Sequence, residues 1–189
     1  MIMKHIILAS NSPRRRELLA GLNLEFEVRV LPDIDESYPK DLPAVEVAGY
    51  ISREKADSYR ALIGEDDLVI TADTVVIVGN EVLGKPKDAD EARRMLHLIS
   101  GRTHQVITGV CLLTTDKEHS FSVTTDVTFK QLSDDEITYY IEHYKPFDKA
   151  GAYGIQEWIG YIGVTSINGS YFNVMGLPVQ RLWEEIKKI

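Results

Sequence analysis

The chain has 189 residues, 44% of them hydrophobic, and a formal net charge of −8, which fits a single domain over residues 1–189 with a packed core. The negative charge argues against binding nucleic acid or an anionic membrane, because proteins that bind such partners carry an excess of lysine and arginine. Neither a targeting segment nor an apolar stretch of about 20 residues is evident, so we expect a cytoplasmic protein.

The first elements are a short apolar strand and a basic helix start. Residues 6–9 (IILA) predict a buried strand, Ser10-Asn11-Ser12 predicts a turn, and Pro13 is placed to begin a helix capped by Ser12. Arg14–Arg16 have the wrong sign for the positive end of a helix dipole. They suit either a bound polyanion or a solvated basic helix start, and residue types alone leave both interpretations open.

A loop rich in acidic residues leads into the second predicted helix. Residues 31–42 contain two prolines and an acidic cluster that includes Glu36, and the helix begins at Pro43. Lys55 lies on the apolar stripe of this helix, four residues from both Ile51 and Tyr59. It either extends from the core edge to solvent or points into a binding cleft.

The most informative single residue is Asp73. It interrupts an almost wholly apolar run, residues 68–78, where a carboxylate is costly unless it is paired, bound to a metal or at a strand end. We predict that it ends a buried strand. After a hairpin turn at Gly79-Asn80, Lys85 stands between Gly84 and Pro86, which predicts a stiff, exposed turn.

The remaining chain predicts helices around antiparallel strands. Capping signals open helices at Asp88 and Ser133, and the β-rich stretches 106–114 and 121–129 are expected to pair. The only cysteine, Cys111, falls in the first of these stretches, so we expect a buried, inert thiol and no internal disulfide. These elements together indicate a mixed α/β sheet.

The C-terminal part combines small residues with a final helix. Residues 148–156 are rich in glycine and alanine, as in places where backbones approach closely, and residues 169–177 read as a loop. A helix from Pro178 is predicted to bury four apolar side chains, Val179, Leu182, Trp183 and Ile186.

Several catalytic classes lack their motifs. The histidines show no H-E-x-x-H spacing, and neither G-x-S-x-G nor the P-loop pattern occurs. What remains is a set of arginines, lysines and carboxylates on turns at strand ends. That set suits a phosphate ester bound with Mg²⁺ or Mn²⁺.

Seven segments resemble the motifs of the Maf family of nucleoside triphosphate pyrophosphatases, in the same order and over nearly the whole chain. They are residues 10–15 (SNSPRR), 52–56 (SREKA), 72–76 (ADTVV), 84–86 (GKP), 100–104 (SGRTH), 148–156 (DKAGAYGIQ) and 173–178 (NVMGLP). The resemblance implies an elongated mixed α/β sheet with flanking helices and two lobes around a central cleft, similar to inosine triphosphate pyrophosphatase. It also implies hydrolysis of a nucleoside triphosphate to the monophosphate and pyrophosphate with a divalent metal cation.

The resemblance also assigns roles to individual residues. Asp73 matches the proton acceptor, and Arg14, Thr74 and Gln156 match positions linked to base specificity. Glutamine rather than glutamate at position 156 resembles the branch that acts on dTTP and UTP, rather than the branch that acts on 7-methyl-GTP. A second interpretation keeps this chemistry but shifts the substrate to modified or non-standard nucleotides, modified pyrimidine nucleotides among them.

The residue chemistry is consistent with these roles. The arginine turn with Arg14 and Arg15, together with Lys55 and Lys85, is expected to hold the triphosphate. Ser10, Thr74 and Gln156 complete the candidate substrate-binding residues. Glu36 and Asp73 are the candidate metal ligands. Glu36 either binds the metal or belongs to a solvated acidic turn, and the sequence leaves both interpretations open. Whether Asp73 acts as a base or mainly as a metal ligand is also left open.

A different class of function also fits the resemblance. A nucleotide-binding regulator of cell division, in line with the septum-formation role that gives the family its name, would bind the nucleotide without turning it over. Measured turnover separates the two classes. The sequence leaves the oligomeric state open, a homodimer included.

Overall fold

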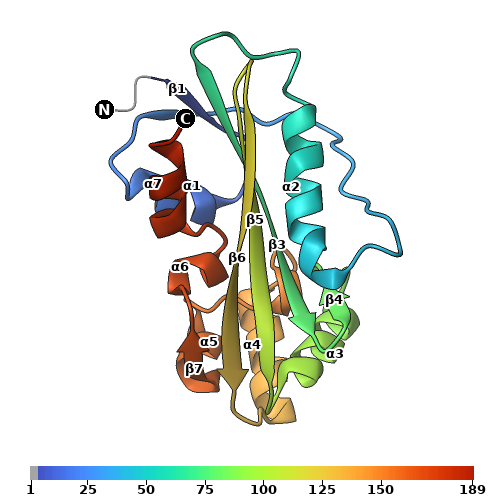
Figure 1. Ribbon diagram of the computed structural model, residues 1–189. Helices are drawn as coiled ribbons and strands as arrows, with labels where there is room; N and C mark the ends of the chain where they lie inside the picture. Colours follow the sequence, from blue (N-terminus) through green and yellow to red (C-terminus); the bar gives the residue numbers. More distant parts are fainter. Residues whose placement is uncertain (1–3) are drawn as a thin grey trace. The chain divides into compact units, whose positions relative to one another are not determined.

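The computed structural model describes residues 4–189, which form a mixed α/β fold (Figure 1). A seven-stranded sheet has the order β2-β1-β3-β5-β6-β7, and β4 pairs with β3 off this path. The strands are β1 His5–Leu8, β2 Phe26–Val28, β3 Asp67–Val78, β4 Glu81–Leu83, β5 Thr103–Leu113, β6 Glu118–Phe129 and β7 Val164–Asn168. The mixed α/β class predicted from the sequence is confirmed.

Helices flank the sheet and connect its strands. They are α1 Pro13–Ala20, α2 Val47–Asp57, α3 Ala89–Ile99, α4 Asp134–Tyr144, α5 Trp158–Gly163, α6 Tyr171–Met175 and α7 Val179–Ile186, with 3₁₀ turns η1 Ala44–Glu46 and η2 Ala150–Ala152. Within residues 4–189, none of these helices is long and apolar enough to cross a membrane.

The chain divides into two compact units. Unit 1 comprises the chain up to Asp73, Thr108–Val123 and Gly176–Ile189, and unit 2 comprises Thr74–Ile107 and Thr124–Met175. Strands β3, β5 and β6 contribute residues to both units. The single domain over residues 1–189 and the central cleft stay predictions.

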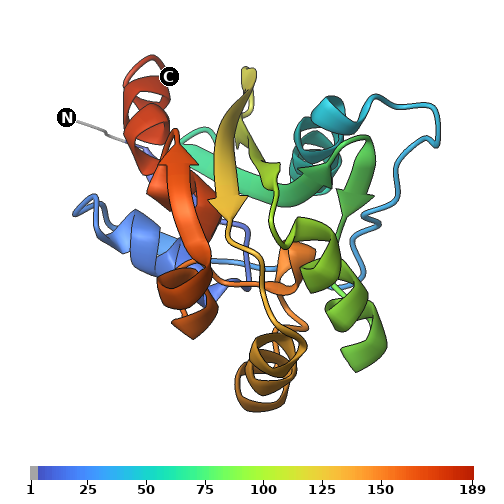
Figure 2. The same cartoon turned by 90° about the horizontal axis from the view of Figure 1, so that it is seen from below.

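In unit 1, helices cover both sides of a parallel part of the sheet. β1 pairs in parallel with β2 and with β3, where Ile7 lies opposite Val69. Figures 1 and 2 show α1 and α7 on one side of these strands and α2 on the other. Burial on both faces explains why the residues of β1 and of the first half of β3 are almost continuously apolar.

Helix α2 approaches the sheet very closely. A Cβ atom on Gly109 of β5 would lie 2.5 Å from the backbone of Ala48 on α2, so only glycine fits there. On the neighbouring strand, the Thr71 hydroxyl donates a 2.6 Å hydrogen bond to the Ser52 carbonyl oxygen. These two contacts fix the height of α2 above the sheet and its position along β3.

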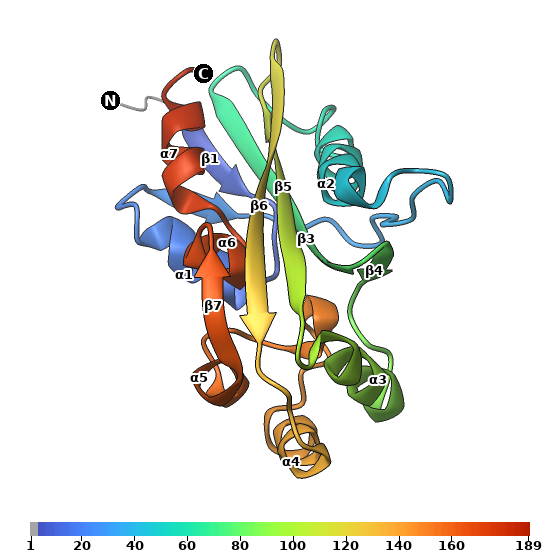
Figure 3. The ribbon, with the colours of Figure 1, turned by 60° about the horizontal axis from the view of Figure 1, so that its bottom comes forward.

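In unit 2, the predicted helix starts are confirmed. The Asp88 side chain caps α3 by accepting from the Glu91 backbone N–H at 2.8 Å, and Ser133 and Glu136 form a complete capping box at α4. Helices α3 and α4 contact each other, and α3 also contacts η2. β7 pairs antiparallel with β6 at the edge of the sheet, as Figure 3 shows.

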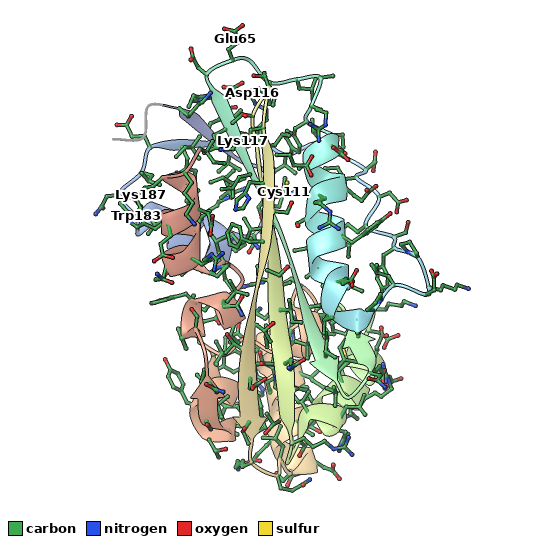
Figure 4. The ribbon with its side chains drawn as sticks, viewed as in Figure 1. Glu65, Cys111, Asp116, Lys117, Trp183 and Lys187 are labelled. Carbon is green, nitrogen blue, oxygen red and sulfur yellow. The ribbon has the colours of Figure 1, made fainter. Side chains whose placement is uncertain are left out.

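The predicted pair of long strands is also confirmed. β5 and β6 are neighbours joined through a turn in which the Thr114 N–H donates to the Lys117 carbonyl, a connection too short for parallel strands. Cys111 on β5, labelled in Figure 4, is fully buried, and burial raises the pKa of its thiol to about 11. The thiol is therefore inert, as predicted.

Two predictions near the C-terminus were wrong. Residues 169–177 contain the short helix α6 rather than only a loop. Trp183 on α7 is 39% exposed, and in Figure 4 it lies with Lys187 along the outside of the helix. Glu185 is buried in its place, because hydrogen bonds from Lys188, His119 and Arg181 outweigh desolvation and lower its pKa to about 2.

Candidate active site

The centre of the site in unit 1 is one lysine between two carboxylates. The Lys55 Nζ atom lies 2.9 Å from Glu36 Oε1 and 2.9 Å from Asp73 Oδ1. The two carboxylate oxygens can therefore be separated by at most twice that distance. The side chains of Lys55 and Asp73 are only 12% and 14% exposed, whereas that of Glu36 is half exposed.

The backbone arrangement explains why these side chains meet. Thr71 and Asp73 are two residues apart on β3 and so point to the same face of the strand. Ser52 and Lys55 are three residues apart on α2 and share a helix face. The hydrogen bond from Thr71 to Ser52 sets the register of helix against strand and brings the Lys55 ammonium to the Asp73 carboxylate.

This geometry answers one question that the sequence left open and corrects one prediction. Lys55 does not extend to solvent from the core edge, because it is paired with two carboxylates and largely buried. Asp73 does not end a buried strand, because β3 continues without a break to Val78. Pairing with Lys55, rather than a position at the strand end, compensates for the carboxylate within the apolar run.

Arg15 holds the backbone next to Asp73. Its Nη1 donates to the Ala72 carbonyl at 2.9 Å, and its Nε donates to the Gly176 carbonyl at 2.8 Å. Burial lowers the pKa of Arg15, and the charges of Asp73 and Glu36 act in the opposite direction. The guanidinium thus joins α1, β3 and the segment before α7 within unit 1, a role that the sequence did not predict.

The predicted turn before α1 is confirmed. The Ser12 side chain accepts from the Arg15 backbone N–H at 3.4 Å, and the buried Ser10 hydroxyl accepts from the Ser12 N–H at 3.2 Å. Arg14, in the first turn of α1, is half buried. The helix therefore begins with an ordered turn and basic side chains, which suits an anionic group.

Unit 2 carries the other three candidates. Lys85 is exposed in its turn, and the carbonyl of the preceding Gly84 accepts from the Gly151 N–H at 3.1 Å, which ties this turn to the glycine-rich segment. In that segment, the Oε1 atom of Gln156 is buried and has no hydrogen-bond partner among residues 4–189. Thr74 is half buried and follows Asp73 directly on β3.

The residues around Lys55 fit a divalent cation that takes only some of its ligands from the protein and the others from water and the substrate. Within residues 4–189, no group of three or more His, Cys, Asp or Glu side chains could hold a metal alone. Mg²⁺ commonly takes one or two carboxylates and completes its shell with water and substrate phosphates. Glu36 and Asp73 supply such a pair, and the ammonium between them shows that both side chains are directed at positive charge.

Comparison with known proteins identifies the family. The sequence profile described as Maf-like protein matches residues 5–189. The chain belongs to the Maf family. It is 62% identical over 184 residues to the dTTP/UTP pyrophosphatase of Phocaeicola vulgatus, covering 97% of this chain and 95% of that one. It is 58% identical, with the same coverage, to the dTTP/UTP pyrophosphatase of Bacteroides thetaiotaomicron.

Solved structures confirm the predicted fold of this Maf protein. A HAM1 protein from Coxiella burnetii matches with a TM-score of 0.52 at 16% identity, covering 99% of this chain and 100% of that one. The Ham1 protein of Staphylococcus aureus matches with a TM-score of 0.50 at 15% identity, covering 67% and 72%. The chain therefore shares its mixed α/β fold with these two Ham1 proteins.

Replacing Arg15 by lysine tests its structural role. A single ammonium cannot reproduce two directed N–H donors to separate carbonyls, so Arg15→Lys should lower the free energy of unfolding by about 1–3 kcal/mol. The control is Arg16→Lys, because Arg16 is adjacent and exposed, and its change should stay within about 0.5 kcal/mol. Urea denaturation measures both, and equal effects would contradict the role assigned to Arg15.

Proposed function

We propose that this protein is a nucleoside triphosphate pyrophosphatase that hydrolyses dTTP and UTP to the monophosphate and pyrophosphate. The observation that carries the proposal is the pair of carboxylates converging on Lys55 in unit 1. Hard oxygen ligands beside a fixed cation suit a metal-bound polyphosphate. The names of the relatives at 62% and 58% identity support the choice of substrates.

The proposed chemistry assigns a task to each candidate residue. Cleaving the bridge between the α- and β-phosphates requires a water molecule to lose a proton, and Asp73 is the proposed acceptor. Lys55 holds the Asp73 and Glu36 carboxylates together and keeps them oriented. Ser10, Arg14 and Lys85 are proposed to bind phosphate oxygens, since cationic and hydroxyl donors stabilise the charge of the departing pyrophosphate.

The proposed metal site uses the same two carboxylates. Glu36 and Asp73 would hold Mg²⁺ or Mn²⁺, which supplies charge neutralisation at the phosphates when bound. Arg15 contributes by fixing the backbone at Ala72, so that Asp73 presents its carboxylate from a defined position.

Gln156 is the proposed reader of the base, with Thr74 and Arg14 assisting. Uracil and thymine present a carbonyl, an N–H and a second carbonyl along one edge. A glutamine amide can accept from the ring N–H through its oxygen and donate to a carbonyl through its nitrogen. The buried Gln156 Oε1, without a partner among residues 4–189, supports this role, because a buried acceptor is normally satisfied.

A panel of nucleotides tests the proposal. The purified protein is incubated with dTTP, UTP, a 5-modified pyrimidine triphosphate, GTP and 7-methyl-GTP, with Mg²⁺, with Mn²⁺ or with chelator, and pyrophosphate is measured. We expect pyrophosphate from dTTP and UTP only when a divalent cation is present. Binding without turnover of any nucleotide would contradict the proposal and favour the regulator of cell division.

Asp73→Asn tests the proton acceptor. The amide is nearly isosteric and can still accept from Lys55, so the fold should persist while kcat on dTTP falls by about 10²–10⁴-fold. Asp66→Asn is the control, because Asp66 is an exposed carboxylate next to the same strand. Circular dichroism checks the fold. Near wild-type turnover of the Asp73 variant would make this carboxylate structural.

Gln156→Glu tests the assignment of the base. A carboxylate would face a pyrimidine carbonyl with charge and would lose the donor that the amide supplies. Since a mismatched buried polar group is costly, kcat/KM for dTTP and UTP should fall at least about 100-fold more than kcat/KM for GTP. If Gln156 only braces the glycine-rich segment, activity on every nucleotide would fall by a similar factor, and the role in base recognition would be rejected.

A further inference from the structure

A network of polar side chains in unit 2, centred on the buried residues Tyr140 and Lys149, holds the Gln156 segment. The Tyr140 hydroxyl, on α4, donates to Glu157 Oε2 and accepts from the Gly154 backbone N–H at 3.0 Å. The Lys149 Nζ atom lies 3.1 Å from Glu157 Oε1 and 2.9 Å from Asp148 Oδ1. Tyr140 is fully buried and the Lys149 side chain is 9% exposed.

These contacts bracket Gln156 along the chain. Lys149 precedes η2 and Glu157 directly follows Gln156, so their ion pair closes the segment between them. Tyr140 holds the segment a second time at Gly154, two residues before Gln156. A glutamine whose neighbours on both sides are fixed has few conformations left for its own backbone.

The backbone of the segment is built closely around this network. A Cβ atom on Gly154 would lie 3.0 Å from both Glu157 Cδ and Lys149 Cε. Buried Ala152 has a φ of +60°, a left-handed conformation that costs a residue with a side chain about 1 kcal/mol or more. Such strain persists where the surrounding contacts over-determine the backbone, and it is concentrated at functional sites.

Stability alone does not account for the network. Burying an ammonium, a carboxylate and a hydroxyl together gains little over well-packed apolar side chains of the same volume. What the network supplies is a single arrangement with defined directions. Burial and the Glu157 carboxylate raise the pKa of Tyr140, so its hydroxyl keeps the proton that it donates to Glu157.

We propose that Tyr140, Glu157 and Lys149 are positioning residues for base selection, which hold the Gln156 amide in the orientation that recognises uracil and thymine. The inference rests on the proposed function. It assigns part of the substrate specificity to a tyrosine on α4 that lies outside every motif quoted from the sequence.

Tyr140→Phe tests the proposal by removing one oxygen atom. Steady-state kinetics on dTTP, UTP and GTP should show a rise in KM for the pyrimidine nucleotides. The ratio of kcat/KM for UTP to that for GTP should fall at least about tenfold, the size expected for losing a hydrogen bond to a charged group. Tyr144→Phe is the matched control, since Tyr144 stacks on Tyr140 at 5.2 Å but is 37% exposed. It should leave the ratio within about twofold.

The outcomes separate the two proposals. If Tyr140 has a purely structural role, Tyr140→Phe should lower the melting temperature and reduce the activity on every nucleotide by the same factor. The ratio of kcat/KM for UTP to that for GTP would then stay unchanged, and this result would overturn the inference. Glu157→Gln keeps an acceptor for Tyr140 but loses the ion pair with Lys149. If Tyr140→Phe does not fold, the ratio of kcat/KM for UTP to that for GTP is measured on Glu157→Gln instead, and an unchanged ratio again overturns the inference. If the wild-type protein hydrolyses UTP and the folded Tyr140→Phe variant has the same ratio of kcat/KM for UTP to that for GTP, only the inference about Tyr140 is overturned. Wild-type protein inactive on pyrimidine triphosphates overturns the proposed function as well.

Discussion

The Lys55 ammonium, which lies between two carboxylates, is the interaction around which the site in unit 1 is arranged. Asp73 lies within a strand that is otherwise almost wholly apolar, and a carboxylate there is costly without a partner. Lys55 supplies that partner and also contacts Glu36 from the acidic loop. Because α2 and β3 must bring these charges together, the close approach at Gly109 and the bond from Thr71 to Ser52 follow as conditions for the site.

Both units place candidate side chains through polar groups on neighbouring helices. Arg15 fixes the carbonyl of Ala72 beside Asp73 in unit 1, and Tyr140 fixes the N–H of Gly154 near Gln156 in unit 2. In each case a side chain on a helix holds the backbone of a strand or loop at one atom. Asp73 and Gln156 are thereby each positioned through a backbone atom close to them in the chain.

The features that could be predicted from the sequence are local ones. The cap at Ser12, the capping box at Ser133 and the turn at Gly79-Asn80 depend on residues only a few positions apart, and the structure has all three. The family resemblance named candidates from Ser10 to Gln156, and the structure brings Glu36, Lys55 and Asp73 together.

What could not be predicted depends on partners far apart in the chain. The burial of Glu185 in place of Trp183 requires His119 from β6, which no helical pattern reveals. The contacts of Arg15 with the Ala72 and Gly176 carbonyls could not be predicted either, because they join segments far apart in the chain. Its binding of phosphate stays a prediction. Helix α5 and strand β7 were not predicted, because α5 is only six residues long and β7 is mostly exposed, so neither gives a sustained apolar periodicity.

A double-mutant cycle on Lys55 and Asp73 tests the central interaction most directly. The free energy of unfolding is measured by urea denaturation for wild-type protein, Lys55→Met, Asp73→Asn and the double variant. Lys55→Met alone should cost about 3–5 kcal/mol, because it leaves Asp73 largely buried without its cation. In the Asp73→Asn background the same change should cost at least about 1.5 kcal/mol less. Effects that add to within about 0.5 kcal/mol would contradict the account, because the lysine and the aspartate would then be energetically independent.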